Sequence, residues 1–179
     1  MIHVSQPMTT VPEHFSTPLQ ELVYRTLTRL SIPFQRVEND PAITMEDCQA
    51  IDDRLQMQTV KTLFLCNRQQ TAFYLFVTPG DKPFRTKDFS SALGISRVSF
   101  ASPEQLERLM GTVVGSATVF SALLASAREV RVVFDRALAD SEWYGCPDGT
   151  TTGYMKLRTR DVIDRLLPYT AHTLEWVEV

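Results

Sequence analysis

Hydrophobic and polar positions along the chain follow two different periods, and these periods predict where helices and strands lie. Between residues 19 and 30 the apolar positions recur every three or four residues, which is typical of one buried helix face. Residues 60–66 and 71–77 are rich in β-branched and aromatic residues, and the short polar stretch between them predicts a hairpin. We expect further strands at 34–37, 97–100, 130–134, 154–157 and 173–177, and further helices at 44–55, 86–93, 103–111, 119–125 and 160–167.

Capping residues predict several helix boundaries. Ser102 precedes a first-turn proline, which favours a helix start there. Thr44 is followed by two acidic residues and resembles another helix start, and Thr159 is expected to cap the last helix. Gly94 is expected to end the helix at 86–93.

The order of these elements shows no strict β-α-β alternation and no internal repeat. It predicts a single α+β domain over residues 19–179, built around a mixed, strongly curved β-sheet flanked by helices. Residues 1–18 are expected to form a loose N-terminal segment, because Pro7, Pro12 and Pro18 interrupt any regular element.

Composition narrows the class of protein. The chain has 179 residues, 44% of them hydrophobic, which is enough for a core without disulfides. No run approaches the roughly 20 apolar residues of a membrane helix, and residues 1–15 lack the pattern of a secretory signal. Cys48, Cys66 and Cys146 are widely spaced with no histidine nearby, so we expect reduced thiols, no metal or other cofactor, and a cytoplasmic location.

Charge is distributed unevenly. The net charge is −3, which argues against a protein whose whole surface binds nucleic acid. Residues 61–100 nevertheless carry 6 basic and 2 acidic side chains. A polyanion could bind this positive region, since phosphate contacts dominate nucleic-acid affinity. The alternative is a set of solvated lysines and arginines around turns.

Common catalytic signatures are missing from the chain. It has no nucleophile elbow, no phosphate-binding loop, no dinucleotide-binding fingerprint and no zinc-protease motif. His3, His14 and His172 lie far from any such pattern, so a histidine-based triad is not expected. Any catalysis must rely on positioning, backbone donors and one lysine.

Three stretches carry the remaining candidate chemistry. Lys61 begins a predicted strand and could grip a phosphate or polarise a carbonyl, or it could simply extend to water. Residues 110–120 contain Gly115 among small residues, so a ligand could approach the backbone N–H groups, although an ordinary connection has the same composition. Residues 144–152 are rich in hydroxyl groups and could line a polar pocket or form a hairpin turn.

The chain carries further motifs in a characteristic order. They are Ile32-Pro33-Phe34, Thr44-Met45-Glu46-Asp47, Lys61-Thr62-Leu63-Phe64-Leu65, Phe73–Val77, Arg97–Leu106, Gly115-Ser116, Val130–Asp135 and Asp161–Leu167. In order and spacing they resemble the bacterial YbaK-type aminoacyl-tRNA editing family, in its free-standing prolyl-tRNA editing (ProX/PrdX) branch. The resemblance covers most of residues 19–179.

The resemblance implies a small hydrolase that acts in trans on the ester between a wrong amino acid and the 3′ end of tRNA. In this branch the substrate is alanine mischarged on tRNA(Pro). The resemblance implies that Lys61 holds the terminal adenosine and its phosphate and that the backbone at Gly115 faces the substrate carbonyl, as the two catalytic residues. It implies substrate contacts from Thr62, Ser116, Ala117, Thr118, Val119 and Cys146. The implied partners are the 3′ end of mischarged tRNA and an aminoacyl-tRNA synthetase, but neither DNA nor a membrane.

The chain departs from the family pattern at several of these positions. Val119 stands where the family loop usually ends in proline, and Cys146 stands where a histidine usually precedes Pro147. Thr62 replaces an asparagine that is common after the family lysine, and Thr150 replaces an asparagine that is common a few residues after Pro147. These departures leave open an editing-fold module that binds aminoacyl-tRNA, a nucleotide or an amino acid without turnover. A third hypothesis is a protein-interaction role for the acidic N-terminal helices.

Overall fold

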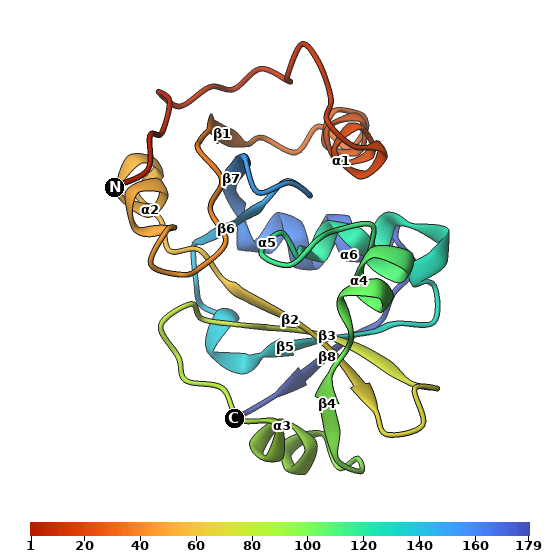
Figure 1. The fold of residues 1–179 in the computed structure, drawn as a ribbon. Coiled ribbons are helices and arrows are strands. Elements are labelled where there is room, and N and C mark those ends of the chain that lie inside the picture. The colour runs from red at the N-terminus through yellow and green to blue at the C-terminus, as the bar shows by residue number, and fades with distance from the viewer.

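Two β-sheets organise the fold in this computed structural model, which describes residues 1–179 (Figure 1). A five-stranded mixed sheet has the order β4-β2-β3-β5-β8, and a three-stranded antiparallel sheet has the order β1-β7-β6. The strands are β1 (Gln35–Glu38), β2 (Lys61–Asn67), β3 (Phe73–Thr78), β4 (Val98–Phe100), β5 (Arg131–Asp135), β6 (Trp143–Pro147), β7 (Gly153–Arg158) and β8 (Leu174–Val177).

Helices surround these sheets and include several short helical turns. The α-helices are α1 (Pro18–Arg29), α2 (Gln49–Leu55), α3 (Thr86–Leu93), α4 (Pro103–Met110), α5 (Thr159–Asp161) and α6 (Leu167–Tyr169). The 3-10 helices are η1 (Val119–Leu123), η2 (Ala125–Ala127) and η3 (Arg136–Leu138), and η4 (Val162–Leu166) is a π-helix between α5 and α6. The predicted single-domain α+β class is confirmed.

The two sheets pack on a shared core, and their backbones are hydrogen-bonded to each other at one point. Thr59 forms a parallel bridge with Gly145, and the N–H of Val60 donates to the carbonyl of Gly145 at 2.8 Å. A Cβ at residue 145 would lie 2.9 Å from the carbonyl oxygen of Gln58, so glycine permits this close approach. The strands expected to form one strongly curved sheet therefore pair as two open sheets, and β6 is an additional strand beyond those predicted.

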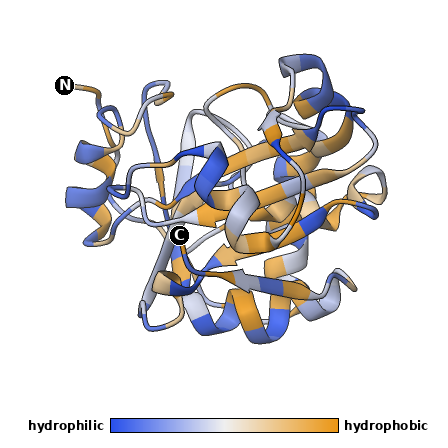
Figure 2. Ribbon diagram, turned by 90° about the horizontal axis from the view of Figure 1, so that it is seen from below, coloured by the Kyte–Doolittle hydropathy of each residue, from blue (hydrophilic) through white to orange (hydrophobic).

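The five-stranded sheet buries both of its faces. Along β2, Phe64 packs with α4 residues such as Leu106, whereas the next residue, Leu65, packs on the opposite face with Phe89 of α3. Figure 2 shows hydrophobic colour along the central strands and hydrophilic colour on outward-facing helical surfaces. The predicted hairpin is confirmed, because β2 and β3 pair antiparallel from Lys61↔Thr78 onward.

Local capping explains which helix boundaries agree with the sequence pattern. The capping box of α4 forms as predicted at Ser102, and α3 ends at Gly94 with φ 70°. Two predictions were wrong at helix starts. Residues 44–48 form a bend followed by a turn and α2 begins only at Gln49, although Thr44 and Asp47 make reciprocal capping bonds. Thr159 is the first residue of α5 and its hydroxyl has no hydrogen-bond partner, so it caps nothing.

The N-terminal segment, residues 1–17, contains no helix or strand and passes from α2 across β1 to α1 (Figure 1). Met8 bridges Arg36 of β1, with both backbone hydrogen bonds at 2.8 Å, and Val4 bridges Asn39. These contacts hold the segment along the edge of the smaller sheet. No helix in the structure is both long and apolar enough to cross a membrane.

Candidate functional site

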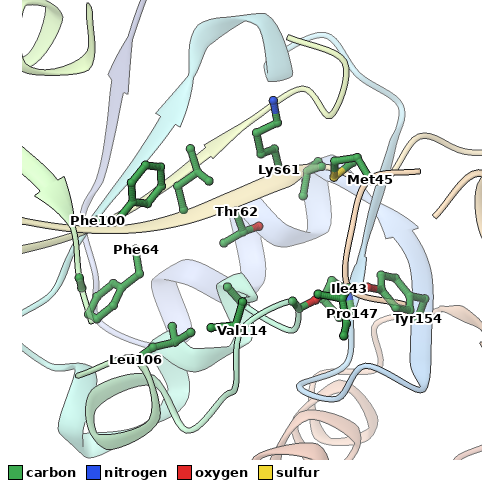
Figure 3. Close-up of a pocket in the computed structure, with 15 residues that line it drawn as sticks. Ile43, Met45, Lys61, Thr62, Phe64, Phe100, Leu106, Val114, Pro147 and Tyr154 are labelled. Atoms are coloured by element: carbon green, nitrogen blue, oxygen red, sulfur yellow. Dashed lines mark hydrogen bonds between the residues drawn. The ribbon is translucent and has the colours of Figure 1, made fainter. Parts of the chain in front are cut away.

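A cavity of about 480 Å³ lies where the two sheets meet, within the roughly 300–1,000 Å³ typical of small-molecule sites (Figure 3). Fifteen residues line it and eleven of them are hydrophobic. One wall is β2, and the loop that carries Val114 faces it. The turn at Ile43 and Met45, the end of β6 at Pro147, and Tyr154 of β7 complete the lining.

Lys61 is the first residue of β2 and supplies the only cation of the cavity lining. Its Nζ donates a hydrogen bond to the carbonyl oxygen of Lys82 at 2.6 Å. Lys61 takes part in none of the ion pairs of the structure. No carboxylate therefore neutralises its charge, and the ammonium keeps donors for an anionic or carbonyl ligand.

The loop opposite Lys61 depends on a glycine. Gly115 has φ +95°, and a Cβ at this position would lie 2.9 Å from the Cα of Ile43. The N–H groups of Gly115 and Ala117 donate to no acceptor within the protein. Both residues line the cavity, so the loop contributes backbone with unpaired donors, a feature that oxyanion-binding segments share.

The side chains that follow Gly115 and Ala117 serve the fold. Ser116 is fully buried, and its hydroxyl is hydrogen-bonded to the backbone N–H and carbonyl of Val113. The Thr118 hydroxyl accepts from the N–H of Phe120 and caps η1. Val119 packs in the main core. None of Ser116, Thr118 and Val119 lines the cavity, although they share the loop that Gly115 and Ala117 bring to it.

Cys146, for which a substrate contact was expected, also lies outside the cavity lining. Alternate residues of a strand face opposite ways, so Pro147 lines the cavity while Cys146 packs in the core beside Tyr144. Burial raises the pKa of the Cys146 thiol well above its usual range, which leaves it protonated and unreactive. Of the expected site residues, the structure brings together Lys61, Thr62, Gly115 and Ala117.

Tyr154 is a cavity residue that sequence reasoning missed. Its hydroxyl donates to the carbonyl of Ala42 at 3.0 Å and lies 3.5 Å from the carbonyl of Gly115. Burial raises the pKa of this phenol, so it stays a protonated donor at neutral pH. Tyr154 thus ties the turn before Ile43 to the glycine loop, and no local sequence signal reveals a link between segments so far apart.

The rim of the cavity is apolar and open to solvent. Ile43, Phe100 and Val114 are each more than half exposed although they are large hydrophobic residues. Asp47 fixes the turn at Ile43, because its carboxylate accepts from the N–H groups of Ile43 and Thr44 at 3.0 and 3.1 Å. These backbone bonds lower the pKa of Asp47, so the restraint persists in mildly acidic solution.

The lining contains no histidine and no carboxylate. Its polar groups are the Lys61 ammonium, the backbone donors of the glycine loop, the Tyr154 phenol, and a Thr62 hydroxyl that is buried without a partner. Such a site has no strong general base. It suits a substrate that is already activated, where orientation and stabilisation of an oxyanion suffice.

Comparisons with known proteins show what this chain is similar to. A family model described as the aminoacyl-tRNA editing domain matches residues 39–164. The prolyl-tRNA editing protein ProX of Acetoanaerobium sticklandii is 26% identical over 160 residues, covering 89% of this chain and 97% of that protein.

Two solved structures share the fold. The hypothetical protein APE2540 aligns with a TM-score of 0.66 at 20% identity, over 87% of this chain and 97% of its own. A candidate trans-editing enzyme for prolyl-tRNA synthetase aligns with a TM-score of 0.66 at 18% identity, over 92% of this chain and 99% of its own. These likenesses concern architecture, whereas the family model covers most of the sequence. The chain therefore belongs to the aminoacyl-tRNA editing domain family.

Proposed function

We propose that this protein is a free-standing deacylase that hydrolyses alanine from mischarged tRNA(Pro) in trans. The observation that carries the proposal is that Lys61 and the Gly115 loop, which are 54 residues apart in sequence, line one cavity. The similarity to a prolyl-tRNA editing protein along 97% of that protein supports the choice of tRNA. The synthetase named as a partner stays a prediction.

In the proposed reaction, water attacks the carbonyl carbon of the aminoacyl ester. The free N–H groups at Gly115 and Ala117 stabilise the oxyanion of the tetrahedral intermediate. When the carbon–oxygen bond to the ribose breaks, the 3′ oxygen takes the proton that the attacking water gives up, and free alanine and intact tRNA are released. Lys61 holds the terminal nucleotide so that the ester reaches the loop.

A panel of charged tRNAs tests this function. We expect wild-type protein, present at a lower concentration than the tRNA, to deacylate Ala-tRNA(Pro) with turnover. We expect it to leave Pro-tRNA(Pro) intact, because the apolar walls restrict the size of the amino acid. Filter binding in the same samples separates the alternatives. Saturable binding of Ala-tRNA(Pro) without release of alanine would instead identify a binding module, and an absence of both would leave the protein-interaction hypothesis.

Gly115→Ala is expected to reduce kcat/KM for Ala-tRNA(Pro) by at least about tenfold, because small displacements of positioning groups cost rate steeply. The added Cβ would press on the backbone of Ile43 at 2.9 Å and move one wall of the cavity. Gly94→Ala is the matched control, since Gly94 also has positive φ (+70°) but open space around it. Equal activity losses in the two variants would attribute the effect to destabilisation alone.

Phe100→Ala is expected to raise KM for tRNA substrates by about tenfold, because stacking of a base on an aromatic ring contributes roughly 1–3 kcal/mol. Phe100 is 58% exposed at the cavity rim, and Phe84 supports its ring from the edge at 5.8 Å. Phe100→Trp should keep a low KM. Val113→Ala removes an exposed apolar side chain outside the lining and serves as control. An unchanged KM in Phe100→Ala would exclude stacking at this position.

A further inference from the structure

We infer that Lys82 and Asp135 are positioning residues that hold the ammonium of Lys61 at the cavity. The consequence for catalysis rests on the proposed function, whereas the orientation of Lys61 does not. Neither residue lines the cavity. Each acts through the backbone carbonyl of Lys82.

The chain of contacts begins at a buried carboxylate. Asp135 is the last residue of β5, and its side chain is 2% exposed. One carboxylate oxygen accepts from the Lys82 ammonium at 2.8 Å and from the Thr78 hydroxyl at 2.7 Å. The other accepts from the N–H of Ala137 at 3.0 Å. Three donors on a rigid strand end make Asp135 a fixed point for Lys82.

The contacts continue from Lys82 to Lys61. Lys82 lies in the connection between β3 and α3, where its N–H donates to the carbonyl of Pro79 at 3.1 Å. Its own carbonyl oxygen accepts from the Lys61 Nζ at 2.6 Å. The Lys82 side chain therefore fixes the residue whose backbone holds the Lys61 ammonium.

These contacts restrict the conformation of the Lys61 side chain, which is flexible by itself. A lysine has a flexible four-carbon stem and loses much rotamer freedom when its ammonium is fixed. A carbonyl acceptor orients the ammonium and leaves its charge uncompensated, whereas a carboxylate partner would neutralise that charge. Lys82 is 30% exposed and Asp135 is buried, so this ion pair differs from the exposed Arg85–Asp88 pair nearby, whose side chains are 79% and 44% exposed.

Two measurements on the variant Lys82→Met test the inference. The first is the rate at which an amine-acylating reagent modifies Lys61 in substrate-free protein, followed by mass spectrometry of the Lys61 peptide. The second is the pair of kinetic constants for Ala-tRNA(Pro). Arg85→Met is the matched control, because it removes the same charge from the same connection but leaves the Lys82 carbonyl anchored.

We expect Lys82→Met to increase the rate of Lys61 modification at least threefold. We also expect it to raise KM about fivefold with a smaller change in kcat, because the variant weakens the binding of the substrate more than the chemical step. Lys82→Arg should restore most of both values, and Asp135→Asn should resemble Lys82→Met if it folds by circular dichroism. Arg85→Met should match wild type in Lys61 modification.

If Lys61 is modified at the wild-type rate in Lys82→Met, the inference is overturned. This holds also if Lys82→Met and Arg85→Met raise KM equally, because the loss of a positive charge then explains the change in KM. If Lys82→Met increases the modification of Lys61 but the wild-type protein hydrolyses no charged tRNA, the positioning role is confirmed and the proposed function is rejected. The two failures are therefore distinguishable.

Discussion

Lys61→Met is expected to lower kcat/KM for Ala-tRNA(Pro) by about 100-fold, because a hydrogen bond to a charged group contributes roughly 1.5–3 kcal/mol. Lys61 is the only cation of the lining, so no neighbouring side chain replaces it. Methionine keeps the length of the apolar stem and removes only the charge and its donors. Initial rates of alanine release at several tRNA concentrations give the constants.

Lys87→Met is the matched control for Lys61→Met. Lys87 is an exposed residue of α3 in the same basic region and lies outside the cavity lining. A twofold effect or less is expected there, since distant exposed charges are screened by salt. If Lys61→Met retained wild-type kinetics while Lys87→Met did not, Lys61 would have no anchoring role and the basic surface would bind the tRNA.

Asp148→Ala is expected to destabilise the fold by about 3–5 kcal/mol, because it leaves several buried donors unpaired. Asp148 is 1% exposed. Its carboxylate accepts from the Tyr24 hydroxyl at 2.7 Å, the Gln20 amide at 3.0 Å and the Thr150 hydroxyl at 2.7 Å. These bonds join α1 to the turn between β6 and β7. Urea unfolding followed by circular dichroism measures the loss.

A double-mutant cycle assigns this loss to the hydrogen bonds. Tyr24→Phe removes one donor with little change of shape, and the double variant Tyr24→Phe/Asp148→Ala should be less destabilised than the sum of the single variants. Asp140→Ala removes an exposed carboxylate and should change the free energy of unfolding by less than about 0.5 kcal/mol. Additive effects of Tyr24→Phe and Asp148→Ala would contradict the proposed coupling.

Elements with strong local signals were predictable from the sequence. The helix α4 begins at the capping box of Ser102 and ends at the left-handed residue Gly111, and both signals lie next to the helix in the sequence. The start of α2 was not predictable, because the bonds between Thr44 and Asp47 that suggest a helix also form in the turn that shapes the cavity rim. The pairing of the strands into two sheets, joined by the isolated Thr59–Gly145 bridge, was not predictable either, because it depends on contacts between segments far apart in sequence.

The same limit applies to the site. Lys61 and Gly115 were recognisable by residue type and by the order of motifs, and both line the cavity. The burial of Cys146 was not predictable, because the sequence pattern did not reveal that residues 143–147 form a strand with Cys146 on its core-facing side. Exposed Phe100 resembles any core residue of a strand, since its exposure results from tertiary packing.

The single bridge between the sheets has a mechanical consequence. Lys61 follows it by two residues on β2 and Pro147 follows it by two residues on β6, so opposing walls diverge from one joint. Behind this joint the two sheets share one buried core, in which Phe134 of β5 stacks on Tyr144 of β6. The spacing of the two walls is therefore set by packing that no substrate contacts, and we expect substitutions behind the joint to change which amino acids the cavity accepts.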